Sequence, residues 1–439
     1  MTAQDPADAV TPASQTPVPD AAVTDDPAGE PEPLTTPADG VPPVLTTPAE
    51  FAAAAAALAA GSGPVALDTE RASGFRYSGR AYLIQIRRQG AGSFLVDPID
   101  APQALTPLTE VLDGPEWVLH AADQDLPCLR ELGFRCAQLF DTELGGRLLG
   151  VARVNLATMV AEFLGLGLAK GHGAADWSQR PLPDDWLNYA ALDVEVLVEL
   201  RDAVATALAD QGKDRWAAEE FEYVRTRPDP APRTDRWRRT SQIHTVRSPR
   251  QLAVVRELWE AREEVARNRD VAPGRVLPDK AMVEAATASP TSLDDLLRLP
   301  VFKGPRQRRQ ARRWWGAIER ARALPDADLP ARGAGQPGLP PVSRWRQRNP
   351  DASRRFTAVR AELTGIAETH GVPAENLLQP DLVRQLCWDG LPSPVTAESV
   401  DARLSEGSAR RWQRELTVAA IAAALVGADA QDDTATADD

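Results

Sequence analysis

A proline-rich break at residues 228–232 divides the chain into two parts with different hydrophobic patterns. Before this break, short apolar runs such as Val65–Leu67 and Tyr82–Ile86 have the length of buried strands and alternate with helical patterns. After it only helical patterns follow, and a second Pro/Gly-rich stretch at 325–341 separates them into two groups. The sequence therefore predicts an α/β domain, in which helices flank a mixed sheet, followed by all-α modules.

An internal repeat indicates that the two helical modules are related. Val265 and Ala266 recur 101 residues later as Ile366 and Ala367, and repetition at a fixed distance is typical of duplicated units. We expect a disordered acidic segment at 1–45, an α/β domain at 46–225, a linker at 226–245, a helical domain at 246–325, a linker at 326–345, a second helical domain at 346–427 and a disordered acidic tail at 428–439.

The two ends of the chain are acidic and poor in large hydrophobic residues. Residues 1–50 hold nine acids and residues 428–439 hold five, and neither segment contains Lys or Arg. Such segments bury too little apolar surface to offset the entropy cost of ordering the backbone. This is why we expect residues 1–45 and 428–439 to be disordered.

The composition favours a cytoplasmic protein without membrane contact. The longest wholly apolar run, Phe51–Ala60, has ten residues, whereas a membrane-spanning helix needs about 20. No Lys or Arg precedes Arg71, so the basic start of a signal peptide is missing. The three cysteines, Cys128, Cys136 and Cys387, form no CxxC pair and no even framework of disulfides.

The charge is divided unequally between the modules. Residues 51–224 hold 14 basic and 25 acidic residues, whereas residues 233–323 hold 21 basic and 11 acidic residues. A basic module attracts phosphates over long distances, so the first helical module is the expected contact for a nucleic acid. A solvated charged face is the alternative interpretation of the same pattern.

Two carboxylates directly follow the apolar strand at 65–67. Asp68 and Glu70 lie two residues apart, so in an extended strand they project from the same face. Like charges at this distance repel one another unless a cation lies between them. Acids at strand ends also occur without a function, so the pair alone leaves both interpretations open.

Three further residues could complete a site with this pair. Asp125 begins a helix, where an acid is also a good cap for the free backbone N–H groups. Tyr189 and Asp193 lie four residues apart in a helix that begins near Asp184, so they share one face of it. Apolar neighbours predict that this helix is largely buried, and a simple hydrogen-bonded Tyr–Asp pair is the alternative.

In chain order these residues read Asp-x-Glu, Asp and Tyr-x-x-x-Asp on an alternating α/β background. This order resembles the DEDD superfamily of 3′-to-5′ exonucleases, in the branch that carries a tyrosine. The sequence motifs around these residues narrow the resemblance to the ribonuclease D family. These motifs are Val65–Glu70, Tyr82–Ile86, His120–Leu126, Phe140–Thr142, Lys170, Asp176–Leu182 and Tyr189–Val194. The resemblance implies a ribonuclease H-like exonuclease domain at 46–225.

The basic module resembles an HRDC domain, a small helical module that binds nucleic acid. The sequence motifs that carry this resemblance are Leu258–Glu263, Pro278–Met282 and Val301–Gly304. The ribonuclease D family often has a second, degenerate HRDC-like domain, which agrees with the repeat. The second copy has no counterpart of the Lys303-Gly304 motif, so we expect the first copy to make the main contact with nucleic acid.

The resemblance also implies a metal site made by Asp68, Glu70, Asp125 and Asp193. Two Mg²⁺ or Mn²⁺ ions would be held by these carboxylates, because hard cations prefer oxygen ligands. Asp68 would bridge both ions, Glu70 and Asp193 would complete the site of the ion that activates water, and Asp125 would support the second ion. Tyr189 would orient the attacking water, since an unperturbed phenol has a pKa near ~10.

The densest basic cluster follows Lys303 and Gly304, and at continuous helical spacing it would form one positive face beside Trp314 and Trp315. Trp315 is expected in the core of the module, with a base-stacking platform as the alternative. We predict that the cluster binds phosphates, and an idle solvated surface is the alternative. The predicted nucleic-acid-binding residues are Lys303, Gly304, Arg306, Arg308, Arg309, Arg312 and Arg313.

Four polar residues near the motifs have ordinary structural explanations. We expect His120 to be packed at a strand end and Asp141 to cap a helix. Lys170 and Arg180 are compatible with phosphate contacts or with exposed ion pairs. The glycine-rich loop around His172 has no assignment.

The sequence thus predicts a metal-dependent 3′-5′ exoribonuclease that releases nucleoside 5′-monophosphates from RNA with a free 3′ end, such as tRNA precursors. A 3′-5′ DNA exonuclease and a catalytically idle RNA-binding protein with the same fold are the alternatives. No GxxxxGK loop is present, so ATP use is not expected. The oligomeric state does not follow from the sequence.

Overall fold

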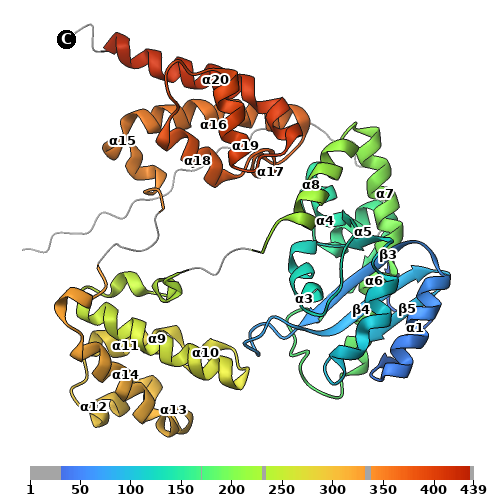
Figure 1. The fold of residues 1–439 in the computed structure, drawn as a ribbon, viewed down its shortest axis with the longest axis horizontal. Coiled ribbons are helices and arrows are strands. Elements are labelled where there is room, and N and C mark those ends of the chain that lie inside the picture. The colour runs from blue at the N-terminus through green and yellow to red at the C-terminus, as the bar shows by residue number, and fades with distance from the viewer. Residues whose placement is uncertain (1–30, 170, 230–233, 332–337, 436–439) are drawn as a thin grey trace, which may run out of the picture.

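The computed structural model describes residues 31–169, 171–229, 234–331 and 338–435 (Figure 1). An α/β domain contains all eight strands of these residues and is followed by two helical modules. The strands are β1 (Glu32–Leu34), β2 (Val44–Leu45), β3 (Ser62–Arg71), β4 (Ala81–Gln89), β5 (Gly92–Val96), β6 (Glu116–Leu119), β7 (Gln138–Asp141) and β8 (Leu166–Leu168). The helices of the α/β domain are α1 (Pro48–Ala60), α2 (Thr106–Val111), α3 (Leu126–Glu131), α4 (Thr142–Leu148), α5 (Leu156–Leu164), α6 (Asp184–Glu195), α7 (Leu197–Asp210) and α8 (Asp214–Thr226).

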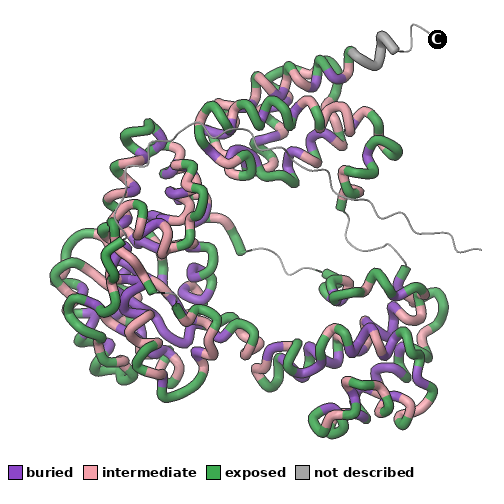
Figure 2. Tube along the Cα trace, turned by 180° about the vertical axis from the view of Figure 1, so that it is seen from behind, coloured by how far each residue is buried: buried purple, intermediate pink, exposed green. Residues whose placement is uncertain are grey.

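Six strands form a mixed sheet in the order β2-β5-β4-β3-β6-β7. Strand β4 runs antiparallel to β3 and β5, whereas β3, β6 and β7 run parallel to one another. Val65, Ala66 and Leu67 are fully buried in the central strand β3, which is why this run is apolar without alternation. Helices lie against the sheet, as predicted, and the buried residues concentrate along its strands (Figure 2).

Part of the segment predicted to be disordered is ordered. Strand β1 pairs with β8, and β2 pairs with β5 at the edge of the main sheet, where the amide of Asp97 donates a hydrogen bond to Leu45. The prediction of disorder was therefore wrong for residues 31–45. Ladder hydrogen bonds at a sheet edge stabilise such short strands with few large hydrophobic side chains. Residues 1–30 lie outside the described part of the chain.

Other local differences come from packing that local patterns do not show. Strands β7 and β8 and helices α2 and α8 were not predicted from the sequence. The helix that was expected to begin near Asp184 is α6, and a break at Val196 separates it from α7. Helix α20 extends to Ala435, so it covers most of the acidic tail that was predicted to be disordered. This helix packs along α16, and such tertiary contact offsets a weak local preference.

The two helical modules repeat one arrangement. The first contains α9 (Pro249–Arg269), α10 (Pro273–Val276), α11 (Asp279–Ala288), α12 (Leu293–Arg298), α13 (Pro305–Arg309) and α14 (Ala311–Ala323). The second contains α15 (Trp345–Arg348), α16 (Pro350–His370), α17 (Ala374–Leu377), α18 (Pro380–Asp389), α19 (Ala397–Glu406) and α20 (Arg411–Ala435). The bounds of α9, α10 and α11 recur in α16, α17 and α18 with an offset of 101 residues, as the sequence repeat predicted.

The first helical module has a hydrophobic core of its own, which includes Phe302 and Trp314. The core of the second module is continuous with that of the α/β domain, where Trp216 and Trp412 stack with ring centroids 4.8 Å apart. In the described part of the chain, no helix is long and apolar enough to span a bilayer.

Candidate active site

The structure brings three of the predicted carboxylates together. Asp68 and Glu70 lie near the carboxyl end of β3, and Asp193 lies on α6, which packs against β3. One carboxylate oxygen from each residue lies within 4.8 Å of the others. The strand period of two places Asp68 and Glu70 on the same face, and the approach of α6 adds Asp193. Hard oxygen donors at these distances suit a divalent cation.

Asp125 reaches the same cavity from a third element. It lies at the N-terminus of α3, yet its side chain makes no capping hydrogen bond to that helix. Instead the Thr69 hydroxyl donates to Asp125 Oδ1 over 2.6 Å. Asp68, Glu70, Asp125 and Asp193 all line one cavity of about 210 Å³. The capping alternative for Asp125 is therefore wrong.

Burial makes these carboxylates poor at holding negative charge without a cation. Burial and the nearby carboxylates raise the pKa of Asp68 well above its usual range and that of Glu70 to about 9. Burial also raises the pKa of Asp193 to about 7 and that of Asp125 to about 6, although hydrogen bonds from Tyr189 and Thr69 oppose these shifts. A bound divalent cation would offset this repulsion, so the donor set fits a metal.

Tyr189 lies one turn before Asp193 on α6 and lines the same cavity. Its hydroxyl hydrogen-bonds to Asp193, and burial together with the neighbouring carboxylates raises the pKa of the phenol above its usual value. The hydroxyl thus stays protonated at neutral pH. A protonated phenol donates and accepts hydrogen bonds but does not act as a strong base.

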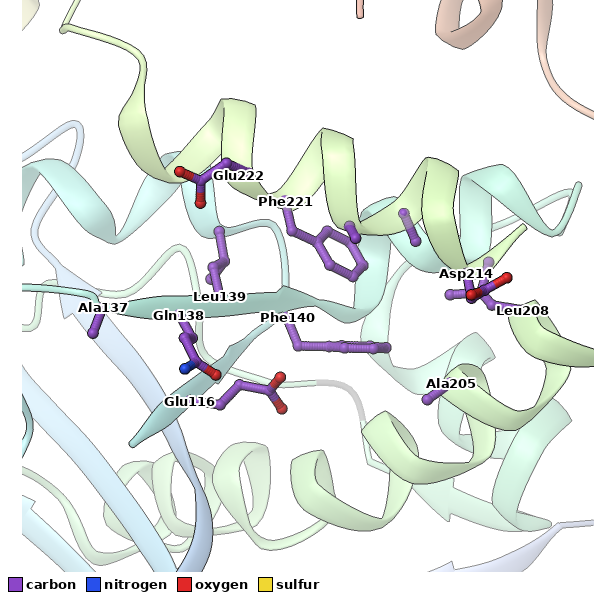
Figure 3. A pocket seen from close by; sticks show the side chains of 12 residues that line it. Glu116, Ala137, Gln138, Leu139, Phe140, Ala205, Leu208, Asp214, Phe221 and Glu222 are labelled. Carbon is purple, nitrogen blue, oxygen red and sulfur yellow. The ribbon is translucent and has the colours of Figure 1, made fainter. Parts of the chain in front are cut away.

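A second cavity of about 290 Å³ lies elsewhere in the α/β domain, between β7, α7 and α8 (Figure 3). Phe140 and Phe221 line it, with ring centroids 4.7 Å apart. Glu116 lies at its rim and forms an ion pair with Arg201. None of the carboxylates predicted for the metal site lines this cavity.

The other polar residues near the motifs have structural partners. His120 Nδ1 lies 2.8 Å from the Thr142 hydroxyl, and burial lowers the pKa of the imidazole to about 4. Asp141 caps α4 by accepting from the amides of Glu143 and Leu144. Arg180 forms an ion pair with Asp97 at 2.6 Å. The prediction that Asp141 caps a helix is therefore confirmed. His120 bonds to Thr142 but is only half-buried and also lines the acidic cavity, so packing alone does not account for its position.

The glycine-rich loop that had no assignment lies against Tyr189. A Cβ atom on Gly171 would lie 1.6 Å from Cε2 of the Tyr189 ring. The imidazole of His172 contacts the same ring edge-on, with centroids 5.9 Å apart. Only glycine therefore fits at 171. In the sequence, the Gly-His-Gly pattern was the one indication that this loop approaches another part of the chain closely. Lys170 lies outside the described residues.

The cavity lining includes residues that were not predicted for the site, among them Thr69 and Arg71. Thr69 lies between the two motif acids and holds Asp125, and Arg71 donates a hydrogen bond to Gln124 Oε1 at 3.0 Å. Both line the cavity with the carboxylates. Their position next to Asp68 and Glu70 was the available signal, but the partner of each is more than 50 residues away in the chain.

The predicted basic face is divided between two helices. Helix α13 ends at Arg309 and α14 begins at Ala311, so the continuous helical spacing that was predicted is wrong. The physical reason is that Gln307 is buried and bridges Val276 and the indole N–H of Trp314, which fixes the turn between the helices. All of the predicted arginines are exposed, and Arg313 forms an ion pair with Glu264 at 3.3 Å. Trp315 is half-buried and packs against the core of the module.

The raised pKa values predict that metal-free protein loses stability as the pH rises. A carboxyl group with a pKa above its unfolded value of ~4 contributes stability below that value and loses it as the pH approaches the folded pKa. With chelator present, the melting temperature should fall by about 4 °C or more between about pH 5 and about pH 8. Mn²⁺ should reverse the fall, because a bound cation stabilises the folded state.

Differential scanning fluorimetry across this pH range, with chelator or with Mn²⁺, measures both effects. In the Asp68→Asn variant the dependence on pH and the shift with Mn²⁺ should both be smaller. Equal behaviour of the variant and the wild type would contradict a cation site at these carboxylates.

Known protein families match the chain in three successive regions. A 3′-5′ exonuclease family matches residues 43–209, the HRDC domain matches residues 251–318, and a 3′ to 5′ exonuclease C-terminal domain matches residues 338–425. The exonuclease match covers the sheet and every element that lines the acidic cavity. The fold and the cavity thus define a 3′-5′ exonuclease of the class that uses divalent metal ions.

Relatives narrow this class further. Ribonuclease D of Gluconacetobacter diazotrophicus is 33% identical over 287 residues, which are 63% of this chain and 71% of the relative. A crystal structure of a Bifidobacterium adolescentis protein has a TM-score of 0.83 and 37% identity, over 90% of this chain and all of that one. Escherichia coli RNase D, described as an exoribonuclease involved in structured RNA processing, has a TM-score of 0.61 and 26% identity, over 85% of this chain and 98% of that one. The chain belongs to the ribonuclease D family, and the predicted family and fold class are confirmed.

Proposed function

We propose that this chain is a 3′-5′ exoribonuclease that removes nucleotides one at a time and releases nucleoside 5′-monophosphates. The observation that carries this proposal is the convergence of Asp68, Glu70, Asp125 and Asp193 in one cavity that Tyr189 also lines. Family membership supports the same reaction. We propose these five residues as the catalytic set and the four carboxylates as ligands of two Mg²⁺ or Mn²⁺ ions.

The residues of the chain would divide the work as follows. When bound, divalent ions lower the pKa of water and stabilise charge on the leaving oxygen. Asp68, Glu70 and Asp193, whose carboxylate oxygens lie within 4.8 Å of one another, would hold the ions together with Asp125, which Thr69 keeps in place. Tyr189, held by Asp193, orients the attacking water and keeps its own proton.

We propose structured RNA with a free 3′ end, such as a tRNA precursor, as the substrate. The Escherichia coli relative is described as acting in structured RNA processing, and the HRDC match and the exposed arginines of the first helical module favour a nucleic-acid contact there. The four lining carboxylates themselves repel a polyanion, so capture of RNA by a separate basic module is physically reasonable.

Digestion of end-labelled substrates tests the proposed function. The substrates are a tRNA precursor, single-stranded RNA and single-stranded DNA, each with Mg²⁺, with Mn²⁺ or with chelator. We expect shortening of RNA from the 3′ end with nucleoside 5′-monophosphates as products, and no cleavage with chelator. Preferential digestion of DNA would favour the DNA exonuclease, and binding without cleavage of any substrate would favour an idle RNA-binding protein.

The basic face should supply binding rather than chemistry. Changing Arg308, Arg309, Arg312 and Arg313 to Gln should raise KM while kcat at saturating RNA stays near that of the wild type. Each lost phosphate contact on a single strand reduces the slope of log K against log salt by about 0.7, so four lost contacts would flatten it by up to about 3.

Fluorescence anisotropy with RNA over a salt series measures this slope. Arg346→Gln with Arg348→Gln is a suitable control, because both arginines are exposed on α15 of the second module. A quadruple variant with the affinity and slope of the wild type would show that the cluster is a solvated surface only.

A further inference from the structure

Both helical modules contact the α/β domain through the same position of the repeat. In the first module the residue that follows the long helix α9 is Asp270, and in the second the residue that follows the equivalent helix α16 is Gly371. The two positions are 101 residues apart, which is the offset of the repeat, and both have a left-handed backbone with φ of 46° and 57°. The corner after the first long helix therefore contacts the α/β domain in both modules, and the second module has in addition the shared core around Trp216 and Trp412.

The first module makes this contact with a side chain. Asp270 Oδ1 accepts hydrogen bonds from the amides of Tyr77 at 3.2 Å and Ser78 at 2.8 Å. Oδ2 accepts from the Tyr82 hydroxyl at 3.2 Å and lies 3.6 Å from the Arg80 guanidinium. One carboxylate thus receives two amides, a hydroxyl and a cation from the α/β domain.

Backbone contacts extend this docking point. The amide of Ala272 donates to the carbonyl of Phe75 at 2.9 Å, and Arg275 Nε donates to the carbonyl of Gly74 at 2.7 Å. The Arg275 guanidinium also lies over the Phe75 ring, 4.1 Å from its centroid. In Figure 1 the segment between β3 and β4 reaches toward α10. The contacted segment connects β3 to β4, so it directly follows the strand that carries Asp68 and Glu70.

The second module uses its backbone instead. Lys213 Nζ donates to the carbonyl of Gly371 at 3.4 Å, and a Cβ atom on Gly150 would lie 2.6 Å from the same carbonyl oxygen. His370 contacts the ring of Trp216 edge-on, with centroids 5.6 Å apart. Close approach of two backbones requires glycine here, whereas in the first module the side chain of Asp270 spans the gap.

Asp270 occupies a backbone conformation that favours glycine, and its repeat equivalent is glycine. The cost of the left-handed backbone at Asp270 is offset by the four groups that its carboxylate receives. The contacted connection is in turn linked to the segment Asp176–Leu182, because Arg76 Nε donates to the Ser178 hydroxyl at 2.7 Å. The docking point therefore ties the basic module to two segments that are continuous in the chain with cavity residues, namely with Arg71 and with Gly173 and Tyr189.

We propose that Asp270 is a positioning residue that fixes the first helical module, with its arginines, relative to the exonuclease cavity. This inference rests on the proposed function and adds the means by which binding is coupled to cleavage. A docked module holds its phosphate contacts at one distance from the cavity, which raises the effective concentration of a bound 3′ end there. A substrate too short to reach the module gains nothing from the contact.

The Asp270→Gly variant tests this inference without weakening the helix end, because glycine is favoured at this φ. We expect faster hydrogen exchange in peptides that contain the amides of Tyr77 and Ser78, and unchanged exchange in the interior of α9. KM for a tRNA-length RNA should rise about fivefold to tenfold at unchanged kcat. Cleavage of a trinucleotide should not change.

Two further variants sharpen the test. Asp270→Asn keeps the one oxygen that accepts from both amides but loses the ion pair with Arg80 and the acceptor for the Tyr82 hydroxyl, so its KM should lie between those of the wild type and Asp270→Gly. Ser289→Gly is the matched control, since Ser289 also follows a helix of this module with a positive φ of 50°, and its hydroxyl donates a hydrogen bond to the carbonyl of Ala286 in the same module. This variant should behave like the wild type in both measurements.

The outcomes are distinct. Unchanged exchange at Tyr77 and Ser78 in Asp270→Gly would overturn the docking contact. Faster exchange with unchanged KM for long RNA would overturn its role in positioning. An absence of cleavage by the wild-type protein would refute the proposed function instead, and the exchange measurement would still decide whether Asp270 docks the module.

Discussion

Replacement of Asp68 by asparagine should lower the rate of RNA cleavage by more than about 10³-fold, and Asp193→Asn should have a similar effect. Asparagine keeps the shape of the side chain but removes the charge that holds a divalent cation. The affinity for RNA should remain the same or rise, because each change also removes one negative charge from the cavity. Single-turnover cleavage of end-labelled RNA and anisotropy with uncleaved RNA measure the two quantities separately.

Asp184→Asn is the matched control for these variants. Asp184 is an exposed acid in the first turn of the helix that carries Asp193, and it does not line the cavity. Its replacement should leave the cleavage rate within about twofold of the wild type. If Asp68→Asn or Asp193→Asn still cleaved at nearly the wild-type rate, the proposed metal site would be wrong.

The Tyr189→Phe variant should cleave RNA about 10- to 10³-fold more slowly, with RNA affinity unchanged. The phenylalanine ring keeps the contacts with His172 and with Trp177. What is lost is the hydroxyl that hydrogen-bonds to Asp193 and that we propose orients the attacking water. Because the raised pKa keeps this hydroxyl protonated, the pH dependence of the residual cleavage should not change its shape.

Tyr223→Phe provides the comparison for this change. Tyr223 lies on α8, where its ring contacts the guanidinium groups of Arg227 and Arg410 outside the acidic cavity. This variant should cleave at the wild-type rate. A Tyr189→Phe variant as active as Tyr223→Phe would show that the Tyr189 hydroxyl has no part in the reaction.

The geometry of the proposed metal site was partly predictable, because some of it depends on local periodicity. Residues two apart on a strand share a face, so Asp68 and Glu70 had to project together once β3 formed. Residues four apart on a helix are neighbours, which places Tyr189 one turn from Asp193. The repeat of the helical modules was also predictable from the sequence, because similar residues at a fixed offset form the same helices.

The role of Asp125 depended on tertiary contacts. At the start of a helix an acid has two explanations, a cap and a site residue, and the local sequence is the same for both. The Thr69 hydroxyl, 56 residues away in the chain, turns the carboxylate toward the cavity. Asp141 shows the opposite outcome at the next helix start, where the carboxylate does cap the backbone.

The basic cluster shows the limit of helical spacing. The run from Arg306 to Arg313 has the composition of one continuous helix, yet it is divided at Gln310. Buried hydrogen bonds of Gln307 to Val276 and Trp314 set this division. Residues at helical spacing share one face only if the helix is unbroken. A single buried polar side chain that bonds to distant partners can interrupt the helix.

By itself, the sequence determined the order of modules, the strand and helix character of their main elements and the pairing of Asp68 with Glu70 and of Tyr189 with Asp193. Each of these features follows from interactions between residues that are close in the chain. Such interactions are reflected in the periodicity of apolar and polar side chains. Only the tertiary structure decided the convergence of the acids in one cavity, the pairing of β1 with β8 and of β2 with β5, and the docking of Asp270 on Tyr77 and Ser78. These depend on contacts between segments far apart in the chain, for which local patterns carry no signal.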